Sequence, residues 1–277
     1  MVNKCGNLNI GQFSKSAIET GTHNLTKLVL WLISWGWTTE RVIQILLGVK
    51  RRPCADFVKR GVLNKTKPPA GFLSGYILKN EYFQAGIEFN RFYSSSYRYN
   101  EVRTNSIPYK SLGNHNEIAQ LALLEYLNEY DNLIYFTEPE MRSQLKGVRG
   151  IGVPDFETFF PVVCFSASPG IKMSENTECQ LIKVWHEIEL SQKSELQLFF
   201  KLQGLDRARQ SNLFSRLVWW SNERIRAKLI KSLQRERIPY VFRQPNGRFA
   251  IDLEREGWSP KKLFSVSEFR DLPRIPN

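Results

Sequence analysis

The stretch KVWHEIELSQKS, residues 183–194, places two carboxylates on one predicted strand. Its apolar residues alternate with other residues, which is the period of a half-buried β-strand, so Glu187 and Glu189 project from the same face, roughly 7 Å apart. Like charges this close destabilise each other and raise each other's pKa unless a positive group lies between them. The spacing therefore predicts that this face of the strand binds a cation.

Two further carboxylates are candidates for the same site. Asp155 lies in GVPDF on the preceding predicted strand, and Glu117 lies four and seven residues before Leu121 and Leu124, on the buried stripe of a predicted helix. Mg²⁺ prefers oxygen ligands and commonly binds through one or two carboxylates plus a substrate phosphate. Such an ion polarises a phosphodiester and activates water beside it. We therefore predict a site for Mg²⁺ or Mn²⁺ made by Glu117, Asp155, Glu187 and Glu189, with capping of the first helical turn as the alternative role of Glu117.

Lys193 follows Glu189 by four residues and would bring an ammonium group to this site. There it would steady a scissile phosphate or a developing oxyanion. A solvated helix start explains the same lysine equally well. The candidate catalytic residues are Glu117, Asp155, Glu187, Glu189 and Lys193.

The positive charge of the 277-residue chain is unevenly distributed. Residues 1–110 hold 16 Lys and Arg against 6 Asp and Glu, whereas residues 111–277 hold 23 against 21. A basic segment joined to a near-neutral one indicates that the first binds a polyanion, of which nucleic acid is the leading candidate and a merely solvated basic surface the alternative. The four cysteines and three histidines are scattered, which argues against zinc and disulfides.

The sequence contains no apolar run of membrane-spanning length, and its N-terminus lacks the apolar core of a signal peptide. We therefore expect a cytoplasmic protein without a membrane partner. The length and the hydrophobic content of 42% suit one large domain or two ordinary ones.

Residues 1–81 are predicted to form three short helices and a basic hairpin. Apolar spacing and flanking caps indicate helices within 23–37, 38–48 and 51–61, followed by two extended pieces around 65–71. This is the order of a winged helix-turn-helix, in which the third helix enters a groove of DNA and the wing contacts phosphates. The alternative is a small helical module with a solvated basic rim. The predicted DNA-binding residues are Arg51, Arg52, Lys59, Arg60, Lys65 and Lys67.

Residues 82–110 are polar and serine-rich without a clear period, which predicts a linker or irregular extension. Residues 111–277 alternate helical and extended patterns in the order αβββαβαββ, a mixed α/β domain with a capping box at Ser194 and Gln197 and a hairpin turn at Asn246-Gly247. The predicted fold class is thus α+β. His186, on the apolar face of its strand, is interpreted as a core histidine, and Trp185, Trp219 and Trp220 are interpreted as core or sheet packing.

Five segments in order resemble plasmid replication-relaxation and MobC-type mobilisation proteins. They are HNEIAQLALL from His115, FTEPEMR from Phe136, VPDF from Val153, HEIELSQKSEL from His186 and LVWWS from Leu217. The resemblance runs from about residue 24 to 245 and implies a winged helix followed by a restriction-endonuclease-like domain of the PD-(D/E)XK nuclease superfamily. In that superfamily a glutamate of the first helix, the aspartate of PD and the acid of the ExK strand hold the metal. The resemblance assigns these roles to Glu117, Asp155 and Glu187.

The sequence departs from this family pattern at one position. The third motif reads Glu187-Ile188-Glu189, so an acid stands where the family has its lysine. Three explanations are open: Lys193 has taken over the role, Glu189 is an additional metal ligand, or the site binds without cleaving.

Together with the charge distribution and the grouped acids, this resemblance implies a DNA-binding protein of a plasmid or integrative element that nicks DNA in a metal-dependent, relaxase- or endonuclease-like reaction. Its expected partners are double-stranded DNA at a transfer or replication origin and other mobilisation proteins. Water is the default nucleophile, and one of the ten tyrosines is the alternative. The main alternative function is a non-catalytic accessory protein or transcriptional regulator of plasmid transfer, and an RNA-processing nuclease is a third.

Overall fold

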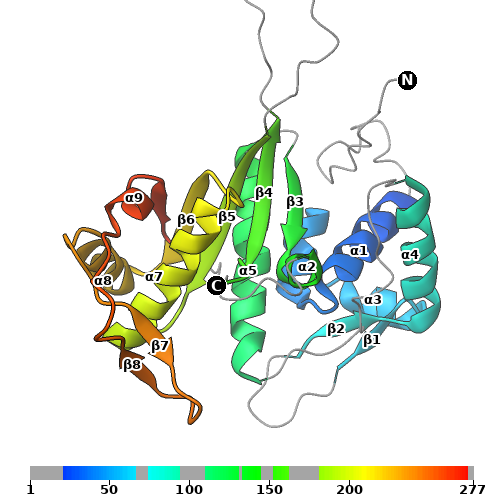
Figure 1. The fold of residues 1–277 in the computed structure, drawn as a ribbon. Coiled ribbons are helices and arrows are strands. Elements are labelled where there is room, and N and C mark those ends of the chain that lie inside the picture. Colours follow the sequence, from blue (N-terminus) through cyan, green and yellow to red (C-terminus); the bar gives the residue numbers. More distant parts are fainter. Residues whose placement is uncertain are drawn as a thin grey trace, which may run out of the picture. The chain divides into compact units, whose positions relative to one another are not determined.

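A computed structural model describes residues 21–66, 74–93, 110–130, 133–144, 152–161 and 181–273. Contacts divide the chain into two compact units, Met1–Gly147 with Leu272–Asn277 and Val148–Asp271. Both units combine helices with strands, so the fold is mixed α+β as predicted (Figure 1). None of the described helices is both long and apolar enough to cross a membrane.

The first unit begins with three helices followed by two paired strands, in the predicted order. Its elements are α1 (Gly21–Trp35), α2 (Glu40–Leu47), α3 (Cys54–Lys59), β1 (Leu63–Lys65), β2 (Tyr76–Leu78), α4 (Asn80–Tyr93), α5 (Lys110–Glu129), β3 (Ile134–Thr137) and α6 (Glu138–Gln144). Strands β1 and β2 are antiparallel, with Leu63 opposite Leu78. Both leucines are fully buried, which joins this small sheet to the helical core.

Local signals in the sequence explain where these helices begin and end. Thr39 caps α2, since its hydroxyl accepts a hydrogen bond from the Val42 backbone N–H at 3.4 Å. Gly48 ends α2 at φ +66°, in the left-handed region that favours glycine. The apolar sides of these helices then pack together, and the shared core includes Leu28, Leu32, Ile43, Cys54 and Phe57.

Helix α4 corrects the prediction of an irregular segment from residue 82. Residues 82–93 are helical, and α4 packs against α1 through Phe83, which is buried. A side chain at Gly86 would meet the Ile33 side chain at 2.2 Å, so the missing Cβ permits this close approach. The apolar stripe of α4 is short and is followed by a serine-rich sequence, so the helix was not recognised from the sequence. Residues 94–109 of the predicted linker lie outside the described residues.

Helix α5 is held in the first unit by buried hydrogen bonds. The Gln120 side-chain oxygen accepts from Trp31 Nε1 and from Thr38 Oγ1, both at 2.7 Å, and its nitrogen donates to the Trp37 carbonyl at 2.9 Å. These contacts place α5 with the N-terminal helices, whereas the sequence assigned residues 111–277 to one C-terminal domain. The predicted domain boundaries at residues 81 and 110 stay predictions.

The second unit is built on a mixed sheet. Its elements are β4 (Phe156–Pro161), β5 (Leu181–Glu189), α7 (Glu195–Gln210), β6 (Arg216–Ser221), α8 (Glu223–Leu233), β7 (Val241–Arg243), β8 (Phe249–Ile251), α9 (Lys261–Phe264) and β9 (Ser267–Arg270). The strand order is β4-β5-β6-β9; β4 is antiparallel to β5, and the later pairs are parallel. The hairpin β7–β8 turns at Gly247 as predicted, with φ +82°, whereas α9 and β9 were not predicted.

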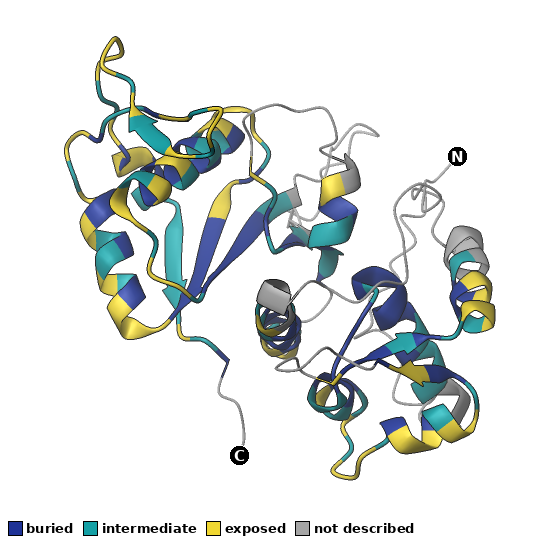
Figure 2. Cartoon of the chain, turned by 90° about the horizontal axis from the view of Figure 1, so that it is seen from below, coloured by how far each residue is buried: buried dark blue, intermediate teal, exposed yellow. Residues whose placement is uncertain are grey.

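Strand β5 is buried from residue 184 to residue 189, as the colouring by burial in Figure 2 illustrates, and its two faces carry chemically different side chains. On one face His186 stacks on Phe156 at 4.2 Å between ring centroids, is hydrogen-bonded to Thr158 at 2.9 Å and accepts from Trp220 Nε1 at 3.2 Å. Burial, and next the Arg270 charge, lower the pKa of His186, so its imidazole is neutral. His186 and the three tryptophans are core residues, as the sequence predicted.

Candidate functional site

The other face of β5 carries two acidic residues, Glu187 and Glu189. Glu187 and Glu189 lie at its C-terminal end, and both side chains are buried. Asp155 lies just before β4, where its backbone N–H donates to the His186 carbonyl at 3.0 Å and its carboxylate accepts from the Ile188 N–H at 2.6 Å. Strand pairing thus brings Asp155 beside Glu187, although 31 residues separate the two in the chain.

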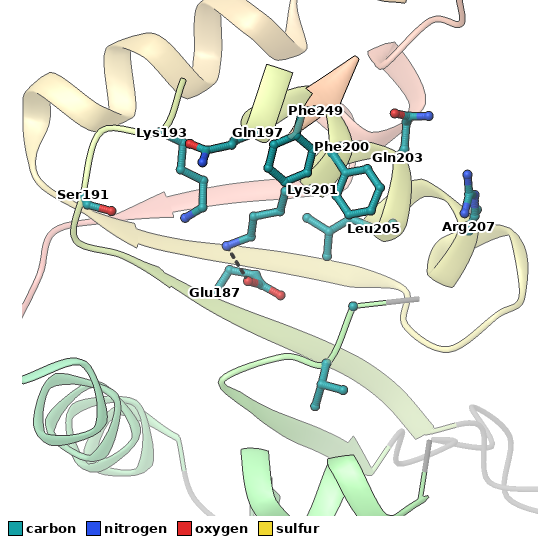
Figure 3. A pocket seen from close by; sticks show the side chains of 13 residues that line it. Glu187, Ser191, Lys193, Gln197, Phe200, Lys201, Gln203, Leu205, Arg207 and Phe249 are labelled. Carbon is teal, nitrogen blue, oxygen red and sulfur yellow. Dashed lines mark ion pairs between the residues drawn. The ribbon is translucent and has the colours of Figure 1, made fainter. Parts of the chain in front are cut away.

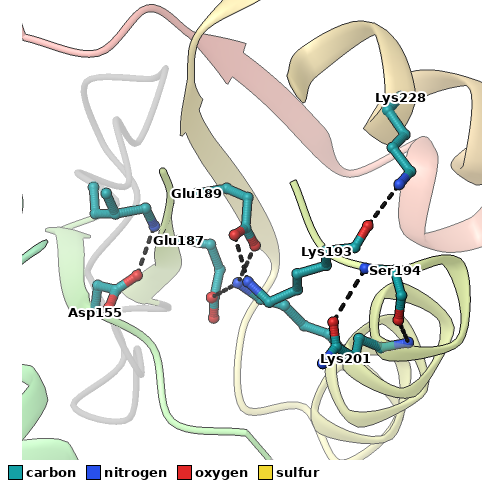
Figure 4. Close-up of polar contacts among 9 residues, drawn as sticks. Asp155, Glu187, Glu189, Lys193, Ser194, Lys201 and Lys228 are labelled. Atoms are coloured by element: carbon teal, nitrogen blue, oxygen red, sulfur yellow. Dashed lines mark hydrogen bonds and ion pairs between the residues drawn. The ribbon is translucent and has the colours of Figure 1, made fainter. Parts of the chain in front are cut away.

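A lysine from the following helix lies between the two strand carboxylates. Lys201 Nζ is 2.7 Å from Glu187 Oε2 and 3.2 Å from Glu189 Oε2, so one ammonium group bridges both acids. Lys193 pairs with the other carboxylate oxygen of Glu189 (Figure 4). Glu187, Glu189, Lys193 and Lys201, together with the neighbouring Asp155, are called the acid–lysine cluster below.

The start of α7 fixes the two lysines relative to the strand. Ser194 and Gln197 form the predicted capping box: the Ser194 hydroxyl accepts from the Gln197 N–H at 3.3 Å, and the Gln197 side chain accepts from the Ser194 N–H at 3.1 Å. Lys228 on α8 donates to the Lys193 carbonyl at 2.6 Å. The loop and the helix that carry the ammonium groups are therefore both anchored.

Burial dominates the electrostatics of the acid–lysine cluster. It raises the pKa of Glu187 to about 7; Lys201 opposes this rise, and Asp155 and Glu189 add to it. Burial alone would lower the pKa of Lys201, but Glu187, Glu189 and Asp155 together raise it above its ordinary value. Lys201 therefore remains charged at neutral pH, while Glu187 can exchange a proton near pH 7.

The cluster contains four of the five predicted catalytic residues: Asp155, Glu187, Glu189 and Lys193. The fifth, Glu117, lies on α5 in the first unit and is buried. There its carboxylate accepts a hydrogen bond at 2.7 Å from the hydroxyl of Thr39, the cap of α2. This contact supports the start of α2, and a metal-binding role of Glu117 stays a prediction.

Lys201 was not predicted from the sequence, although its position among apolar residues of α7 is a signal for a charged partner nearby. Leu198 and Leu205 are buried residues of α7, and Lys201 lies three residues after the first and four before the second. A lysine within an apolar helical stripe must have an anionic partner nearby or reach water. Here the partners are Glu187 and Glu189, and Lys201 also lies over the Trp219 ring at 5.2 Å.

Glu157 is a second titratable residue that was not predicted from the sequence. It lies on β4 opposite Trp185 and is 3% exposed. Burial raises its pKa to about 7, although Lys183 and a hydrogen bond of 3.2 Å from Trp185 Nε1 work in the opposite direction. A buried carboxyl with this pKa is neutral below pH 7 and carries a costly charge above it.

A pocket of about 670 Å³ opens beside the cluster (Figure 3). Helix α7, the loop before it, strand β8 and the segment before Asp155 all contribute to its walls. Its lining includes Glu187, Lys193, Phe200, Lys201, Arg207 and Phe249. The acid–lysine cluster is therefore accessible to a ligand from this pocket.

The donor groups of the cluster fit a divalent cation in kind. Carboxylate oxygens suit Mg²⁺ and Mn²⁺, and the Lys201 ammonium already lies where one cation is shared by Glu187 and Glu189. Ser221 faces Glu189 across the β5–β6 pair, and its buried hydroxyl finds no hydrogen-bond partner among the described residues. Within those residues no group of three or more His, Cys, Asp or Glu is arranged to hold a metal. The cluster therefore suits an ion that is held by two carboxylates together with water or a phosphate, and not an ion that is coordinated by protein ligands alone.

The first unit carries the predicted DNA-binding residues on its surface. Arg51 and Arg52 precede α3, Lys59 and Arg60 end it, and Lys65 lies on β1; all five are exposed. Lys67 lies outside the described residues. This set of five is called the basic surface below.

Compared with protein-family models, curated proteins and solved structures, the chain matches none.

Proposed function

We propose that the chain is a DNA-binding protein of a mobile element that nicks DNA at the acid–lysine cluster with the help of Mg²⁺ or Mn²⁺. The observation that carries this proposal is that Asp155, just before β4, lies beside Glu187 on β5, with the Lys201 ammonium 2.7 Å from Glu187. Two acids and a lysine are the residue types that the PD-(D/E)XK resemblance assigns to this site. The lysine comes from α7 instead of the strand position that Glu189 occupies.

The order of elements supports the same proposal. Helix α5 is followed by β3, β4 and β5, then by α7 and β6, with α6 inserted after β3. The order αβββαβ is the one read from the sequence segments that carry the resemblance. Strand β6 runs parallel to β5, as a helical crossover through α7 requires.

Each cluster residue has a defined task in this proposal. Asp155 and Glu187 hold the cation, and Glu189 orients the lysines. A divalent cation bound there would polarise the scissile phosphodiester and lower the pKa of attacking water. The ammonium of Lys201 would stabilise negative charge developing on the phosphate oxygens. Burial raises the pKa of Glu187 to about 7, and a cation bound beside it would favour the charged form that acts as its ligand.

We propose that the first unit supplies binding to duplex DNA as a winged helix. Helices α1 to α3 followed by the strand pair β1–β2 occur in the order of that motif. The basic surface lies around α3 and on β1, the elements that contact the groove and the phosphates in such proteins. Its exposed cations can pair with phosphates without first leaving a protein partner in the core.

A plasmid-nicking assay tests the proposed function. The DNA is a supercoiled plasmid carrying the duplex site that the full chain selects from a random-sequence library, incubated with Mg²⁺ or Mn²⁺ or with EDTA. We expect conversion to open circles only with the metal ion, and at least a 100-fold loss of rate in Asp155→Asn and in Lys201→Met, as for other residues that stabilise a transition state.

The matched control is Glu195→Gln, which removes an exposed acid from the same helix α7 and should nick like the wild type. Thermal melting of each variant separates loss of chemistry from loss of fold. Metal-dependent nicking that survives Asp155→Asn at the wild-type rate would refute the proposed site.

The alternative is an accessory protein that binds the same DNA without cutting it. One observation favours it: Glu187 and Glu189 are both neutralised by lysines, so the cluster can serve stability alone. Specific duplex binding with no nicking under either metal ion would support this alternative.

A further inference from the structure

The hairpin β7–β8 carries an aromatic ring on the face that points away from helix α7. Phe249 faces α7, since its ring lies 5.2 Å from the Phe200 ring between centroids. Side chains alternate along a strand and Phe249 pairs with Arg243, so Phe242 and its partner Ala250 lie on the opposite face. Phe242 is 45% exposed there. The small side chain of Ala250 cannot cover this ring, which therefore stays accessible to a flat ligand.

Two exposed arginines stand near the turn of this hairpin. Arg243 belongs to β7, and Arg248 immediately precedes β8. The backbone N–H of Gln244 donates to the Arg248 carbonyl at 2.8 Å, which places Arg248 two positions along the hairpin from the Phe242–Ala250 pair and on the same face. This face, formed by Phe242, Gln244, Arg248 and Ala250, is called the outer face below.

The positive charge of the hairpin is not neutralised within it. Residues 241–251 contain two arginines and no aspartate or glutamate. Among the described residues neither arginine forms an ion pair, and Arg243 Nε donates to the Gly247 carbonyl at 3.4 Å. The first acid after the strands, Asp252, accepts a hydrogen bond from the Glu254 backbone N–H at 3.2 Å. The hairpin therefore differs from the acid–lysine cluster, whose lysines are already paired with glutamates.

The backbone that carries these groups is anchored. The buried Val241 N–H donates to the Gln203 side chain on α7 at 2.9 Å, and the hairpin packs along this helix (Figure 1). At the turn the Asn246 side chain accepts a hydrogen bond from the Arg248 N–H at 2.9 Å. A binding surface on a fixed backbone loses less conformational freedom when a ligand arrives, which favours affinity.

An accessible ring beside uncompensated cations fits an unpaired nucleic-acid strand. Such a strand offers a flat base and a phosphate at every nucleotide, and aromatic side chains with basic residues are the usual means of binding it. Bases in a duplex are stacked on their neighbours, so their faces cannot reach a protein ring. An acidic peptide would match the arginines but would leave the ring without a stacking partner.

We propose that the outer face of the hairpin binds an unpaired strand of DNA, with a base on Phe242 and a phosphate at Arg248. Arg243 adds positive potential at the same turn. The inference rests on the proposed function in taking DNA as the polyanion. It gives the second unit a DNA contact of its own, on a hairpin attached to the helix that carries Lys201.

Fluorescence anisotropy of the full chain with two labelled oligonucleotides isolates base stacking. One is a dT 12-mer, and the other is an abasic 12-mer with the same phosphates and no bases; EDTA prevents cleavage. We expect the wild type to prefer the dT oligonucleotide by at least about 10-fold. Phe242→Ala should weaken dT binding by about 5- to 150-fold, with little effect on the abasic strand. Arg248→Ala should weaken binding of both and lower the slope of log affinity against log salt by about 0.7.

Two variants control for other causes of lost binding. Leu253→Ala removes an exposed apolar side chain that follows β8, and dT binding should change less than about twofold. Phe242→Trp keeps a ring on the outer face and should retain the preference for dT. Thermal melting confirms that each variant is folded. Equal binding of the two oligonucleotides by the wild type, or a dT preference that survives Phe242→Ala, would overturn the proposal.

Further arms identify other ligands. A 12-base-pair duplex that loses as much affinity as dT in Phe242→Ala would make paired DNA the ligand and overturn the assignment to an unpaired strand. A U 12-mer that binds at least 10-fold more tightly than dT would overturn the assignment to DNA. Binding is measured in EDTA, so a chain that fails to nick can still show the Phe242-dependent preference, and a chain that nicks can lack it. The two proposals therefore fail separately.

Discussion

The two units use charge in opposite ways. In the first unit the basic surface is exposed, and its cations stand on α3, its flanks and β1. In the second unit Glu187 and Glu189 are at most 4% exposed and share the ammonium group of Lys201. Exposed cations cost little to maintain, whereas buried charges lose hydration that only close partners can replace. Composition therefore locates the basic surface, whereas only the fold reveals that Lys201 bridges the two buried glutamates.

This difference has a functional meaning. Binding of a polyanion needs many exposed charges of one sign, which act at a distance and are screened by salt. Chemistry on a phosphodiester needs a few charges whose protonation and position are fixed, which burial provides. Four variants of the chain probe this contrast, in order of decreasing effect on stability.

Lys201→Met removes the cation shared by the two buried glutamates. We expect a loss of about 3 kcal/mol in the free energy of unfolding at pH 8, since one partner of a buried ion pair is left uncompensated. The loss should shrink at pH 5, because Glu187, whose pKa is about 7 even with Lys201 present, then binds a proton in place of the ammonium group. Urea denaturation at both pH values measures this, and Lys193→Met, at a more exposed lysine, should cost less. An equal loss at both pH values would contradict the coupling.

Glu157→Gln should raise stability at alkaline pH. The pKa of this buried carboxyl is about 7 in the fold and near 4.5 in the unfolded chain, so the folded state binds more protons between these values and loses stability as the pH rises through 7. Glutamine keeps an oxygen for Trp185 Nε1 and carries no charge. We expect a gain of about 1–3 kcal/mol at pH 8 and almost none at pH 4.5, measured by thermal melting. A gain independent of pH would show that the charge is not the cause.

Thr39→Ala tests a buried polar link in the first unit. The Thr39 hydroxyl caps α2 and donates to Glu117, so its removal leaves a backbone N–H and a carboxylate without this partner. We expect a loss of about 1–2 kcal/mol in urea denaturation. Thr39→Ser keeps the hydroxyl and should restore most of it. A loss in Thr39→Ser as large as that in Thr39→Ala would show that the missing hydroxyl is not the cause.

The double substitution Arg51→Ala and Arg52→Ala should leave stability within about 0.5 kcal/mol, as expected of exposed residues. Its effect should appear in DNA binding. If both arginines contact phosphates, the slope of log affinity against log salt falls by about 2. Filter binding across a salt series measures the slope, and an unchanged slope would exclude this part of the basic surface from the DNA interface.

The sequence predicted those elements that are governed by local signals. The capping box at Ser194 and the hairpin turn at Gly247 act over a few residues, and the structure confirms both. The alternation around Glu187 correctly predicted a strand, but the prediction that it is half-buried was wrong, because residues 184–189 are buried on both faces of β5. Helix α4 was missed because its apolar stripe is short and adjoins a serine-rich stretch. Strand β9 was missed because it is stabilised by pairing with β6, which lies about fifty residues earlier in the chain.

The acids of the candidate site were predictable from the sequence, whereas Lys201 was not. Period-two alternation places Glu187 and Glu189 on one face wherever the strand lies. The contact with Lys201 depends on how α7 crosses the sheet, which is set by tertiary packing and not by spacing in the sequence. Residues such as Glu157, which appear as ordinary strand positions, likewise acquire a perturbed pKa only through burial.

The capping box at Ser194 also sets how the chain tolerates changes in length. Helix α7 starts there, and Lys201 follows two turns later, so each residue inserted between them would rotate the lysine about 100° around the helix axis. One inserted residue would point the ammonium away from both carboxylates, whereas four would return it to a similar direction one turn further along. Natural length variation in this protein should therefore avoid residues 195–200 and accumulate where no helical phase has to be kept.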